Sequence, residues 1–564
     1  MGRKNFLGVI LMSSILIGYN HFFGKKNQIV KTEKNSQINN QQEKENLEIT
    51  EKKSIERKLY TIEDEEKIIQ IENVGGGIND LTLKKYNHEH LGKVKLIENS
   101  SSNISYNIFL ESGDILCTKN LEFLVEEKDE NKITLYGISE KGYVVKFIYE
   151  LNKNYGLLMK ILVLKDDLEQ KIKKTEIVWV NKLVSTEKDV KACQSKTSVN
   201  FLTKDKNIEN IKPSKEFIEK KIDDNIKWIS FKQRFFTSAI ISKDRLLNSE
   251  ILLETEGEDK KNIVGKIISK IEKESNNKSE EVEILFYFGP NDFYIMKKVA
   301  PSFQRNISFG WGIIRWINTL ITVPVFKMFL SFIKSMTLII LIFVIFIKLI
   351  LFFVSYKSHI SNLKMKFLKP KLDEIKETFK DNMQMIQIEQ MKLYKLTGVN
   401  PFVSIGLLLL QMPIFIAIFN FIPNEISFRL SEFLWVKDLS TFDSILDLPF
   451  FIPMYGNHIS LFTILMTIST ILQTVTSSDM SSQQGNMKIF AYTMPVVFMV
   501  VLNSFPAALS FYYFISNIVT ILIQLFIKKI VDENKIKQEI ELKIKNVSSS
   551  RASFSNRLDK FINS

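Results

Sequence analysis

One apolar run limits what this chain can fold into. Residues 338–353 read LIILIFVIFIKLILFF, and Lys348 is the only polar residue among them. Such a run predicts a helix in a lipid bilayer, where an ammonium near the centre costs about 2.5–3.5 kcal/mol on insertion scales. Tyr356 follows Lys348 by 8 residues, or about 12 Å of helix, so the lysine could extend along its stem to the membrane surface. The alternative is a water-filled cavity that faces the cytoplasm.

The long apolar runs are confined to about residues 300–530, although the mean hydropathy of the whole chain is close to zero. The third and fourth of five candidate membrane spans are shorter than the ~20 residues that a bilayer requires, which implies local thinning or support from neighbouring helices. The five candidates lie at about 336–355, 402–423, 459–476, 488–503 and 508–528. Before them, residues 306–334 mix two tryptophans, an arginine and a proline with apolar residues, which predicts a helix in the membrane interface.

The N-terminus carries a further hydrophobic segment. In residues 1–26, Arg3 and Lys4 precede an apolar stretch, and no small-residue cleavage site follows it. We therefore predict an uncleaved membrane anchor, with a cleaved signal peptide as the alternative. Residues 27–56 lack periodicity and are rich in Lys, Asn, Gln and Glu, which predicts a flexible linker.

The distribution of basic residues predicts the orientation of these spans. Lysines are concentrated in the loop 356–400 and in the tail 531–564, whereas the loop 424–458 contains only two basic residues. Basic loops remain in the cytoplasm. We therefore expect both termini in the cytoplasm and residues 27–305 on the opposite side of the membrane.

Residues 57–305 follow a different pattern. Segments such as KITLYGI at 132–138 and EVEILFYF at 281–288 alternate apolar and polar residues and are rich in Val, Ile, Tyr and Phe, which predicts a large antiparallel β domain. No convincing acid–base pair occurs in it, so we predict a scaffold without catalysis. Its two cysteines, Cys117 and Cys193, are either bridged or free.

The loop 356–400 contains apolar residues at helical spacing, together with four methionines. This pattern predicts two amphipathic helices folded back as a hairpin that ends at Gly398, with adaptable contact surfaces. A simple spacer is the alternative.

Two of the spans carry polar residues along one face. In the last span these are Tyr513, Ser516, Asn517, Thr520 and Gln524, which recur at steps of three or four residues. The span 459–476 carries a comparable stripe of hydroxyls, and Gln411 lies within the run LLLLQMPIF. Such residues either join packed helices or line a polar groove. No Asp or Glu lies in any of the five spans, which counts against an ion-coupled transporter.

The overall charge says little about the partners of this chain. A net charge of +13 is compatible with an anionic partner, but only nine of the 76 basic residues are arginine, so lysine is the default cation of this chain. The sequence contains no Gly-rich phosphate loop and no HExxH, CxxC or GxSxG pattern. We therefore predict that the chain is not an enzyme and that it requires neither a cofactor nor a metal.

Several segments are similar to those of one protein family. They are KMKFLKPKLDEIKE, YKLTGVNPFVSIGLLLLQMPIFIAIF, LWVKDLS, MPVVFMVVLNSFPAALSFYYFISNIVTILIQ, ENVGGGINDLTLKKY and WISFKQRFF. The chain resembles the YidC/Oxa1/Alb3 membrane protein insertases, in the long form of diderm bacteria. The likeness covers almost the whole chain and is most specific from about 356 to 528.

The resemblance implies a periplasmic β-supersandwich domain, an interfacial helix, and a core of five transmembrane helices (335–530) around a hydrophilic groove. It also implies an inner-membrane location for this multi-pass protein. Lys348 stands where the family commonly has a groove arginine, and Phe353 stands where many relatives have proline. The candidate groove residues are Lys348, Gln411, Tyr512, Tyr513, Asn517, Thr520 and Gln524.

These observations predict a membrane protein insertase and chaperone. Its groove would admit the hydrophilic flank of a nascent membrane protein, and the resemblance implies that the apolar helix of this client then moves along 402–423 and 488–503 into lipid. The resemblance implies the Sec translocon and translating ribosomes as partners, the ribosomes through the basic tail and the hairpin, besides membrane lipids. Two other classes stay open: a small-molecule transporter with an accessory domain, and a periplasmic sugar enzyme anchored by helices.

Overall fold

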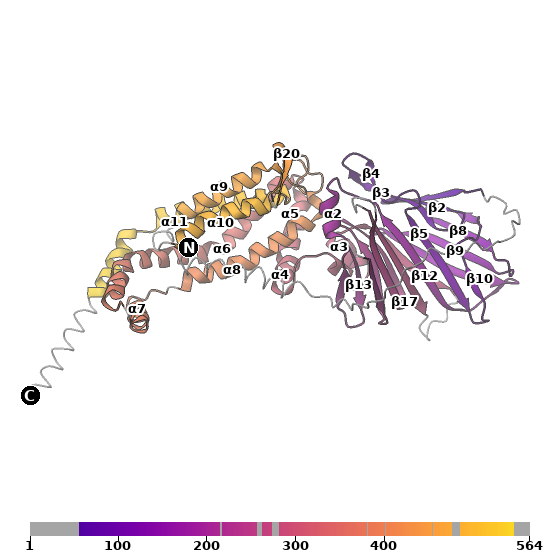
Figure 1. Ribbon diagram of the computed structural model, residues 1–564, viewed down its shortest axis with the longest axis horizontal. Helices are drawn as coiled ribbons and strands as arrows, with labels where there is room; N and C mark the ends of the chain where they lie inside the picture. The colour runs from indigo at the N-terminus through magenta and orange to yellow at the C-terminus, as the bar shows by residue number, and fades with distance from the viewer. Residues whose placement is uncertain are drawn as a thin grey trace, which may run out of the picture. The chain divides into compact units, whose positions relative to one another are not determined.

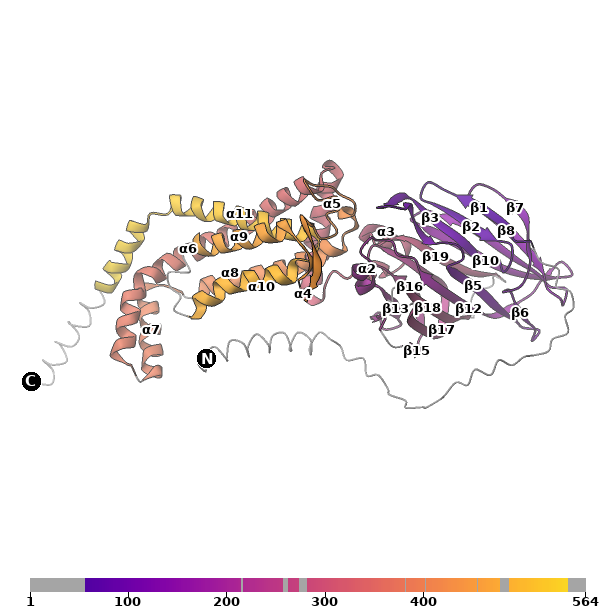
Figure 2. The same ribbon diagram turned by 45° about the horizontal axis from the view of Figure 1, so that its top comes forward.

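The computed structural model describes residues 56–214, 217–256, 262–272, 281–380, 382–400, 402–453, 455–476 and 486–545. The expected anchor at 1–26, almost all of the expected linker at 27–56, and the tail beyond residue 545 lie outside these residues. The described chain forms an antiparallel β domain followed by a set of apolar helices (Figures 1 and 2). A β domain and a helical membrane region are therefore both present, as the sequence predicts.

Nineteen of the described strands belong to the β domain, in sheets of 4 and 15 strands. They are β1 (Leu59–Glu63), β2 (Lys67–Glu72), β3 (Ile78–His88), β4 (Gly92–Ile97), β5 (Ser102–Leu110), β6 (Ile115–Cys117), β7 (Phe123–Lys128), β8 (Lys132–Ile138), β9 (Val144–Asn152), β10 (Gly156–Lys165), β11 (Leu168–Glu169), β12 (Ile172–Leu183), β13 (Ser198–Thr203), β14 (Ile208–Ile211), β15 (Ile218–Ile222), β16 (Ile226–Lys232), β17 (Phe236–Glu256), β18 (Asn262–Glu272) and β19 (Val282–Pro290). The main path of the large sheet runs β6-β5-β12-β18-β17-β19-β10-β9-β8-β7.

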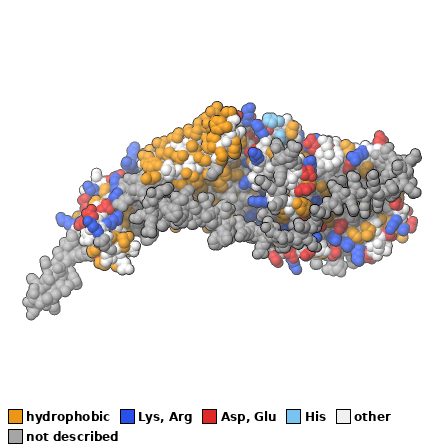
Figure 3. Space-filling view, in the orientation of Figure 1, with side chains coloured by type: hydrophobic (Ala, Val, Ile, Leu, Met, Phe, Trp, Pro, Cys, Tyr) orange, Lys and Arg blue, Asp and Glu red, His pale blue; other side chains and the backbone are white. Residues whose placement is uncertain are grey.

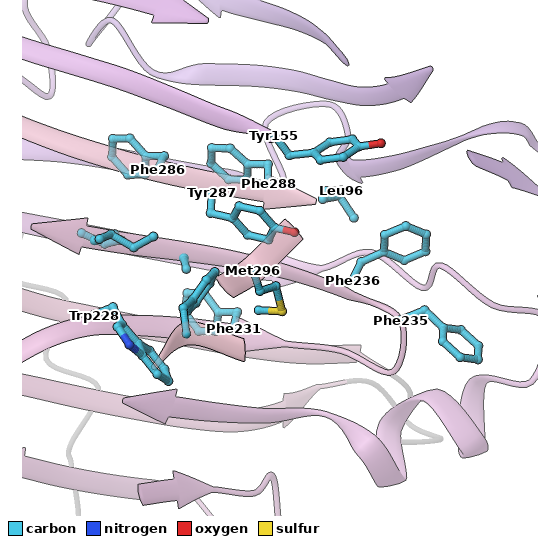
Figure 4. Packing of buried hydrophobic residues seen from close by; sticks show 14 of the residues in the cluster. Leu96, Tyr155, Trp228, Phe231, Phe235, Phe236, Phe286, Tyr287, Phe288 and Met296 are labelled. Atoms are coloured by element: carbon cyan, nitrogen blue, oxygen red, sulfur yellow. The ribbon is translucent and has the colours of Figure 1, made fainter. Parts of the chain in front are cut away.

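Alternating burial explains why these segments are strands. In β9, Val145, Phe147, Tyr149 and Leu151 are buried, and the residues between them are partly exposed. Successive side chains of a strand point to opposite faces, so one face of the sheet forms the core. Trp228 of β16 and Tyr287 of β19 lie in this core (Figure 4). Both pack against Phe303 of the short helix Phe303–Asn306. Cys117 is exposed and Cys193 is buried, and both thiols are free.

The helices occupy most of the remaining described chain. They are α2 (Val190–Lys196), α3 (Phe293–Val299), η1 (Phe303–Asn306), α4 (Gly312–Ile317), the π-helical turn η2 (Asn318–Thr322), α5 (Val323–Phe332), α6 (Met336–Thr378), α7 (Met383–Thr397), α8 (Phe402–Phe421), η3 (Ile422–Asn424), η4 (Ile426–Phe428), α9 (Leu461–Thr476), α10 (Asn486–Leu502) and α11 (Ala507–Ile530). A hairpin of β20 (Leu446–Ile452) and β21 (Gly456–Ile459) lies between α8 and α9 in the chain.

The five predicted spans correspond to α6, α8, α9, α10 and α11. In the described part of the chain, three helical segments are long and apolar enough to cross a membrane: Gly312–Phe332, Met336–Thr378 and Ala507–Ile530. The first of these is the segment for which the sequence predicts an interfacial position, and that position stays a prediction. The described part of α9 has 16 residues and that of α10 has 17. The sequence between them, SSDMSSQQG at 477–485, is mostly polar, so the apolar length of both is below that of a typical span.

Helix α6 continues through residue 356, where the sequence predicts that the hairpin begins. Its 43 residues correspond to about 65 Å, far more than the ~30 Å of hydrocarbon in a bilayer. Its last turns and α7 form the two arms of the hairpin, and α7 ends at Gly398 in a left-handed conformation. Residues 533–545 of the tail are also helical, and Ile540 is buried in a cluster with Leu368 and Leu372 of α6.

Buried and partly buried ion pairs connect the β domain to the loop that follows α8. Lys327 of α5 lies 2.9 Å from Asp292 Oδ2 and 3.0 Å from Glu425 Oε1. Arg429 donates through Nε to both carboxylate oxygens of Glu187, at 2.9 and 3.0 Å, and both side chains are 4% exposed. Because an unpaired buried charge is costly, these contacts hold the loop in one arrangement.

Asp292 also caps α3, where its Oδ1 accepts hydrogen bonds from the backbone N–H groups of Tyr294 and Ile295. Burial raises the pKa of the Asp292 carboxyl, but Lys327 and the two N–H groups lower it, and the net pKa lies below its ordinary value. The carboxylate therefore stabilises the fold above the unfolded pKa of Asp, about 3.9. This contribution is lost as the pH falls through the folded pKa.

We expect Asp292→Asn, which keeps a capping oxygen but removes the charge, to lower the free energy of unfolding at pH 7 by about 1.5–3 kcal/mol. The measurement is the Tm of the full chain in detergent from pH 7 towards pH 3, where the difference from wild type should narrow. Asp205→Asn, in an exposed turn, is the control. Equal Tm values for both variants at pH 7 would contradict the prediction.

Candidate functional site

A cavity of about 260 Å³ lies among α6, α8, α9, α10 and α11. Its lining combines apolar and aromatic side chains with a small set of polar ones. The lining residues are Ile347, Lys348, Leu351, Gln411, Ile414, Phe415, Met466, Thr470, Gln473, Pro495, Phe498, Leu502, Tyr512, Tyr513, Ser516 and Asn517. The predicted span containing the lysine and the predicted polar face of the last span therefore meet at one cavity.

Lys348 is the one charged residue in this lining. It lies 12 residues after Met336, the first residue of α6, or about 18 Å along the helix. In the part of the chain that the structure describes, no ion pair and no hydrogen bond to its ammonium is present. An ammonium has three donors and no acceptor, so water or an incoming acceptor has to satisfy them.

The polar side chains of α11 form hydrogen bonds to different partners. Asn517 donates to Ser469 Oγ at 3.0 Å and to Thr470 Oγ1 at 2.8 Å, which joins α11 to α9. The Tyr513 hydroxyl donates to the carbonyl oxygen of Phe415 at 3.2 Å, and the two rings stack with centroids 4.7 Å apart. These residues therefore hold the helices together and also form part of the cavity wall.

Five of the seven candidate groove residues line the cavity: Lys348, Gln411, Tyr512, Tyr513 and Asn517. The other two, Thr520 and Gln524, lie further along α11 and are not part of its lining. The Thr520 hydroxyl donates to the carbonyl oxygen of Ser516 at 2.7 Å. Gln524 Oε1 is buried and has no hydrogen-bond partner among the described residues.

The hydroxyl stripe of α9 divides into two parts. Ser460, Thr463 and Thr467 are buried, and Thr463 Oγ1 lies 3.1 Å from Ser510 Oγ of α11, which is the packing role left open by the sequence. Thr470 reaches the cavity. Asp443, which the sequence did not single out, accepts hydrogen bonds from the backbone N–H groups of Leu461 and Phe462 and so caps the start of α9.

Sequence reasoning also missed Gln473 and the apolar part of the lining. Gln473 follows Thr470 by three residues, so it falls on the same face of α9, and an amide in a short apolar helix is the signal that could have identified it. Met466, Phe415 and Phe498 give no such signal, because apolar residues surround every side of these helices in the sequence.

An aromatic cluster lies beside the cavity. Phe326 packs against Phe421 and Phe428, with ring centroids 5.1 and 5.2 Å apart, and Tyr512 of the cavity wall lies 6.5 Å from Phe343. These rings belong to α5, η4 and the ends of the spans near the loop that contacts the β domain. Within the described residues, no group of three or more His, Cys, Asp or Glu side chains could hold a metal ion.

Comparisons with known proteins identify the family. The model of the YidC periplasmic domain matches residues 59–328, and that of the 60Kd inner membrane protein matches residues 328–535. The membrane protein insertase YidC of Amoebophilus asiaticus is 35% identical over 100% of this chain and 98% of its own length. That of Cytophaga hutchinsonii is 34% identical over 90% of this chain and 84% of its own length.

Among solved structures, an active YidC insertase with its first transmembrane domain resolved matches 83% of this chain and 94% of its own chain. Its sequence identity is 17% and its TM-score is 0.33. The assignment depends on the two sequence relatives and on the two adjoining family models. The chain belongs to the YidC family of membrane protein insertases.

Proposed function

We propose that this chain inserts nascent membrane proteins by admitting the hydrophilic flank of a client into the cavity around Lys348. The observation that carries the proposal is an ammonium without a partner among the described residues, in a cavity that also contains amides and hydroxyls from three helices. A charge inside the membrane is expensive unless it is hydrated or paired. The cavity therefore holds water until a polar segment enters.

The positive charge favours an acidic or carbonyl-rich flank. Lysine presents a compact point charge on a flexible stem, whereas arginine binds a carboxylate through two parallel hydrogen bonds. A lysine at this position therefore suits a contact that forms and breaks as the client passes.

The apolar segment of the client supplies the driving force. About 20 apolar residues, at roughly −0.3 to −0.6 kcal/mol each, contribute about 6–12 kcal/mol on entering lipid. Support for a path along α8 and α10 comes from their exposed apolar side chains, which include Leu409, Leu410, Val497 and Val501. Because α9 and α10 are short, the membrane beside the cavity would be thinner, which reduces the distance that a polar flank has to cross. No nucleotide is required.

We further propose that both termini are cytoplasmic, and that the hairpin and the tail bind translating ribosomes while the membrane core cooperates with the Sec translocon. The tail helix packs against the hairpin through Ile540, and Lys364 of α6 lies 3.6 Å from Glu539. The two basic segments therefore form one surface, which suits an anionic partner such as ribosomal RNA.

Substitution of Lys348 tests the role of its charge. We expect Lys348→Arg to support insertion of a client with a short external tail, and Lys348→Ala to slow it by one to two powers of ten, the equivalent of a charge-assisted contact of about 1.5–3 kcal/mol. Lys348→Glu should slow it further. The measurement is protease protection of the client in cells depleted of the wild-type chain, at matched protein levels.

The matched control is Lys334→Glu, which reverses an exposed charge outside the cavity. It should leave insertion unchanged. Normal insertion with both Lys348→Ala and Lys348→Glu would remove this lysine from the mechanism.

Hydration of the cavity can be tested with two adjacent residues of α9. Gln473 lines the cavity, whereas Leu472 is 51% exposed on the outer surface of the helix and is absent from the lining. In a chain carrying Cys117→Ser and Cys193→Ala, we expect a maleimide to label Gln473→Cys several-fold faster than Leu472→Cys in membranes, because the reaction requires a hydrated thiolate. Equal, slow labelling of both positions would mean that the cavity is dry.

Ribosome binding should depend on the charge of the tail. Replacing the seven Lys and Arg residues after Ile530 by Gln leaves Ile540 in place, and we expect it to reduce co-sedimentation with ribosomes and to flatten its dependence on salt. An equal number of exposed β-domain lysines changed to Gln serves as the control. Unchanged co-sedimentation of the tail variant would exclude the tail from this contact.

A further inference from the structure

The hairpin of β20 and β21 exposes an unusual amount of apolar surface. Strand β20 reads LDLPFFI, and Asp447 is its only polar residue. Leu446 is 55% exposed, Phe450 59% and Phe451 68%. Single exposed apolar residues are common on protein surfaces, but a contiguous group of this kind marks a surface that something covers.

The hairpin is held firmly at its base. Asn503, between α10 and α11, donates to the carbonyl oxygens of Tyr455 and His458 at 2.9 and 2.8 Å, and its Oδ1 accepts from the backbone N–H of Ser460. The His458 ring stacks on Phe442, with centroids 3.8 Å apart. An isolated two-stranded hairpin is marginally stable in water, so these contacts fix the direction in which β20 presents its side chains.

The exposed side chains of β20 continue the outer surface of α9. Strand β21 ends at Ile459, and α9 begins two residues later. Along α9, Ile468, Leu472 and Val475 are each at least half exposed, as expected for residues that face lipid. Figure 3 shows hydrophobic side chains covering the surface from α9 up to the end where Figure 1 places β20.

We propose that the β20–β21 hairpin is inserted into the periplasmic headgroup region of the bilayer, with Phe450 and Phe451 in contact with lipid. The hairpin belongs to the periplasmic side because the same loop carries Arg429, which binds Glu187 of the periplasmic β domain. Aromatic residues are enriched at this depth of a membrane, where the ring is apolar and its surroundings are partly wet.

The backbone of β20 indicates that the hairpin lies in the membrane interface and not in the hydrocarbon core. The pairing register shifts between Asp447 and Ile452, so the residues between them have no ladder partner on β21. Unpaired N–H and C=O groups are not tolerated in hydrocarbon but can bond to water and headgroups. Pro449 removes one N–H from this edge, and Asp447 accepts a hydrogen bond from Ser444 at 2.6 Å at the base of the hairpin.

Lipid explains the surface better than a protein partner does. The exposed residues of β20 beyond Asp447 carry no charge and no side-chain hydrogen-bonding group that could orient a partner, whereas protein interfaces usually combine apolar anchors with a polar rim. The hairpin also adds apolar length, which α9 lacks. The 16 described residues of α9 span about 24 Å, against about 30 Å of hydrocarbon, and the sequence that follows them at 477–485 is mostly polar.

The test places a bimane fluorophore on Phe451→Cys in the full chain with Cys117→Ser and Cys193→Ala, reconstituted as single copies in phosphatidylethanolamine–phosphatidylglycerol nanodiscs. Quenching is measured with a nitroxide-labelled lipid and, separately, with aqueous iodide. Leu472→Cys on α9 is the lipid-facing control. Leu168→Cys, on a strand of the β domain and 69% exposed, is the water-facing control.

We expect the label at Phe451→Cys to be quenched by the nitroxide lipid and shielded from iodide, as at Leu472→Cys. Quenching by iodide to the extent seen at Leu168→Cys would overturn the proposal. Protection from both quenchers would also overturn it, because a protein surface and not lipid would then cover the hairpin. Neither result depends on client insertion through the cavity.

Discussion

The cost of a polar group inside a membrane determines how these helices are arranged. Many hydroxyls in the described spans donate to backbone carbonyl oxygens, and a few polar side chains bind one another between helices, as Asn517 does with Ser469 and Thr470, and Thr463 with Ser510. These contacts bring α9 and α11 together and need no water. Lys348 is different, because the described residues offer its ammonium no partner, and the proposed hydration of the adjoining cavity would lower the cost of its charge in the bilayer.

A second set of charges fixes the periplasmic end. Lys327, between Asp292 and Glu425, and Arg429, on Glu187, are paired in places where an unpaired charge would be strongly destabilising. They order the loop after α8, and Asp443 of the same loop caps α9. The ends of α8 and α9 are therefore held on this side, next to the aromatic cluster around Phe326. Paired charges stabilise one end of the bundle, whereas the charge of Lys348, which has no partner in the described part of the chain, lies within it.

Local periodicity predicted much of this arrangement. The antiparallel β domain, the spans and the polar face of α11 all follow from residue spacing, and five of the seven candidate residues line one cavity. Spacing could not reveal that α6 continues past residue 356, because no breaking residue marks the membrane boundary. It also could not identify the partners of Lys327 or Arg429, which come from distant segments, or the β20–β21 hairpin, whose residues resemble an ordinary apolar loop. Whether Gln473 lies at the cavity depends on how α9 packs against the other helices, which the spacing within α9 does not show.

The two ends of α9 now have different surroundings. At its start, β21 leads into the helix and the apolar side chains of β20 extend its lipid-facing surface towards the periplasm. Towards its other described end, Thr470 and Gln473 line the cavity, and the residues that follow Thr476 in the sequence, SSDMSSQQG at 477–485, are mostly polar. If lipid covers the hairpin, the missing apolar length of α9 falls entirely at this second end. The bilayer would then be thinned beside Gln473 and Lys348, where a polar flank has to enter, and not on the periplasmic side, where the aromatic cluster and the buried ion pairs hold the helices together.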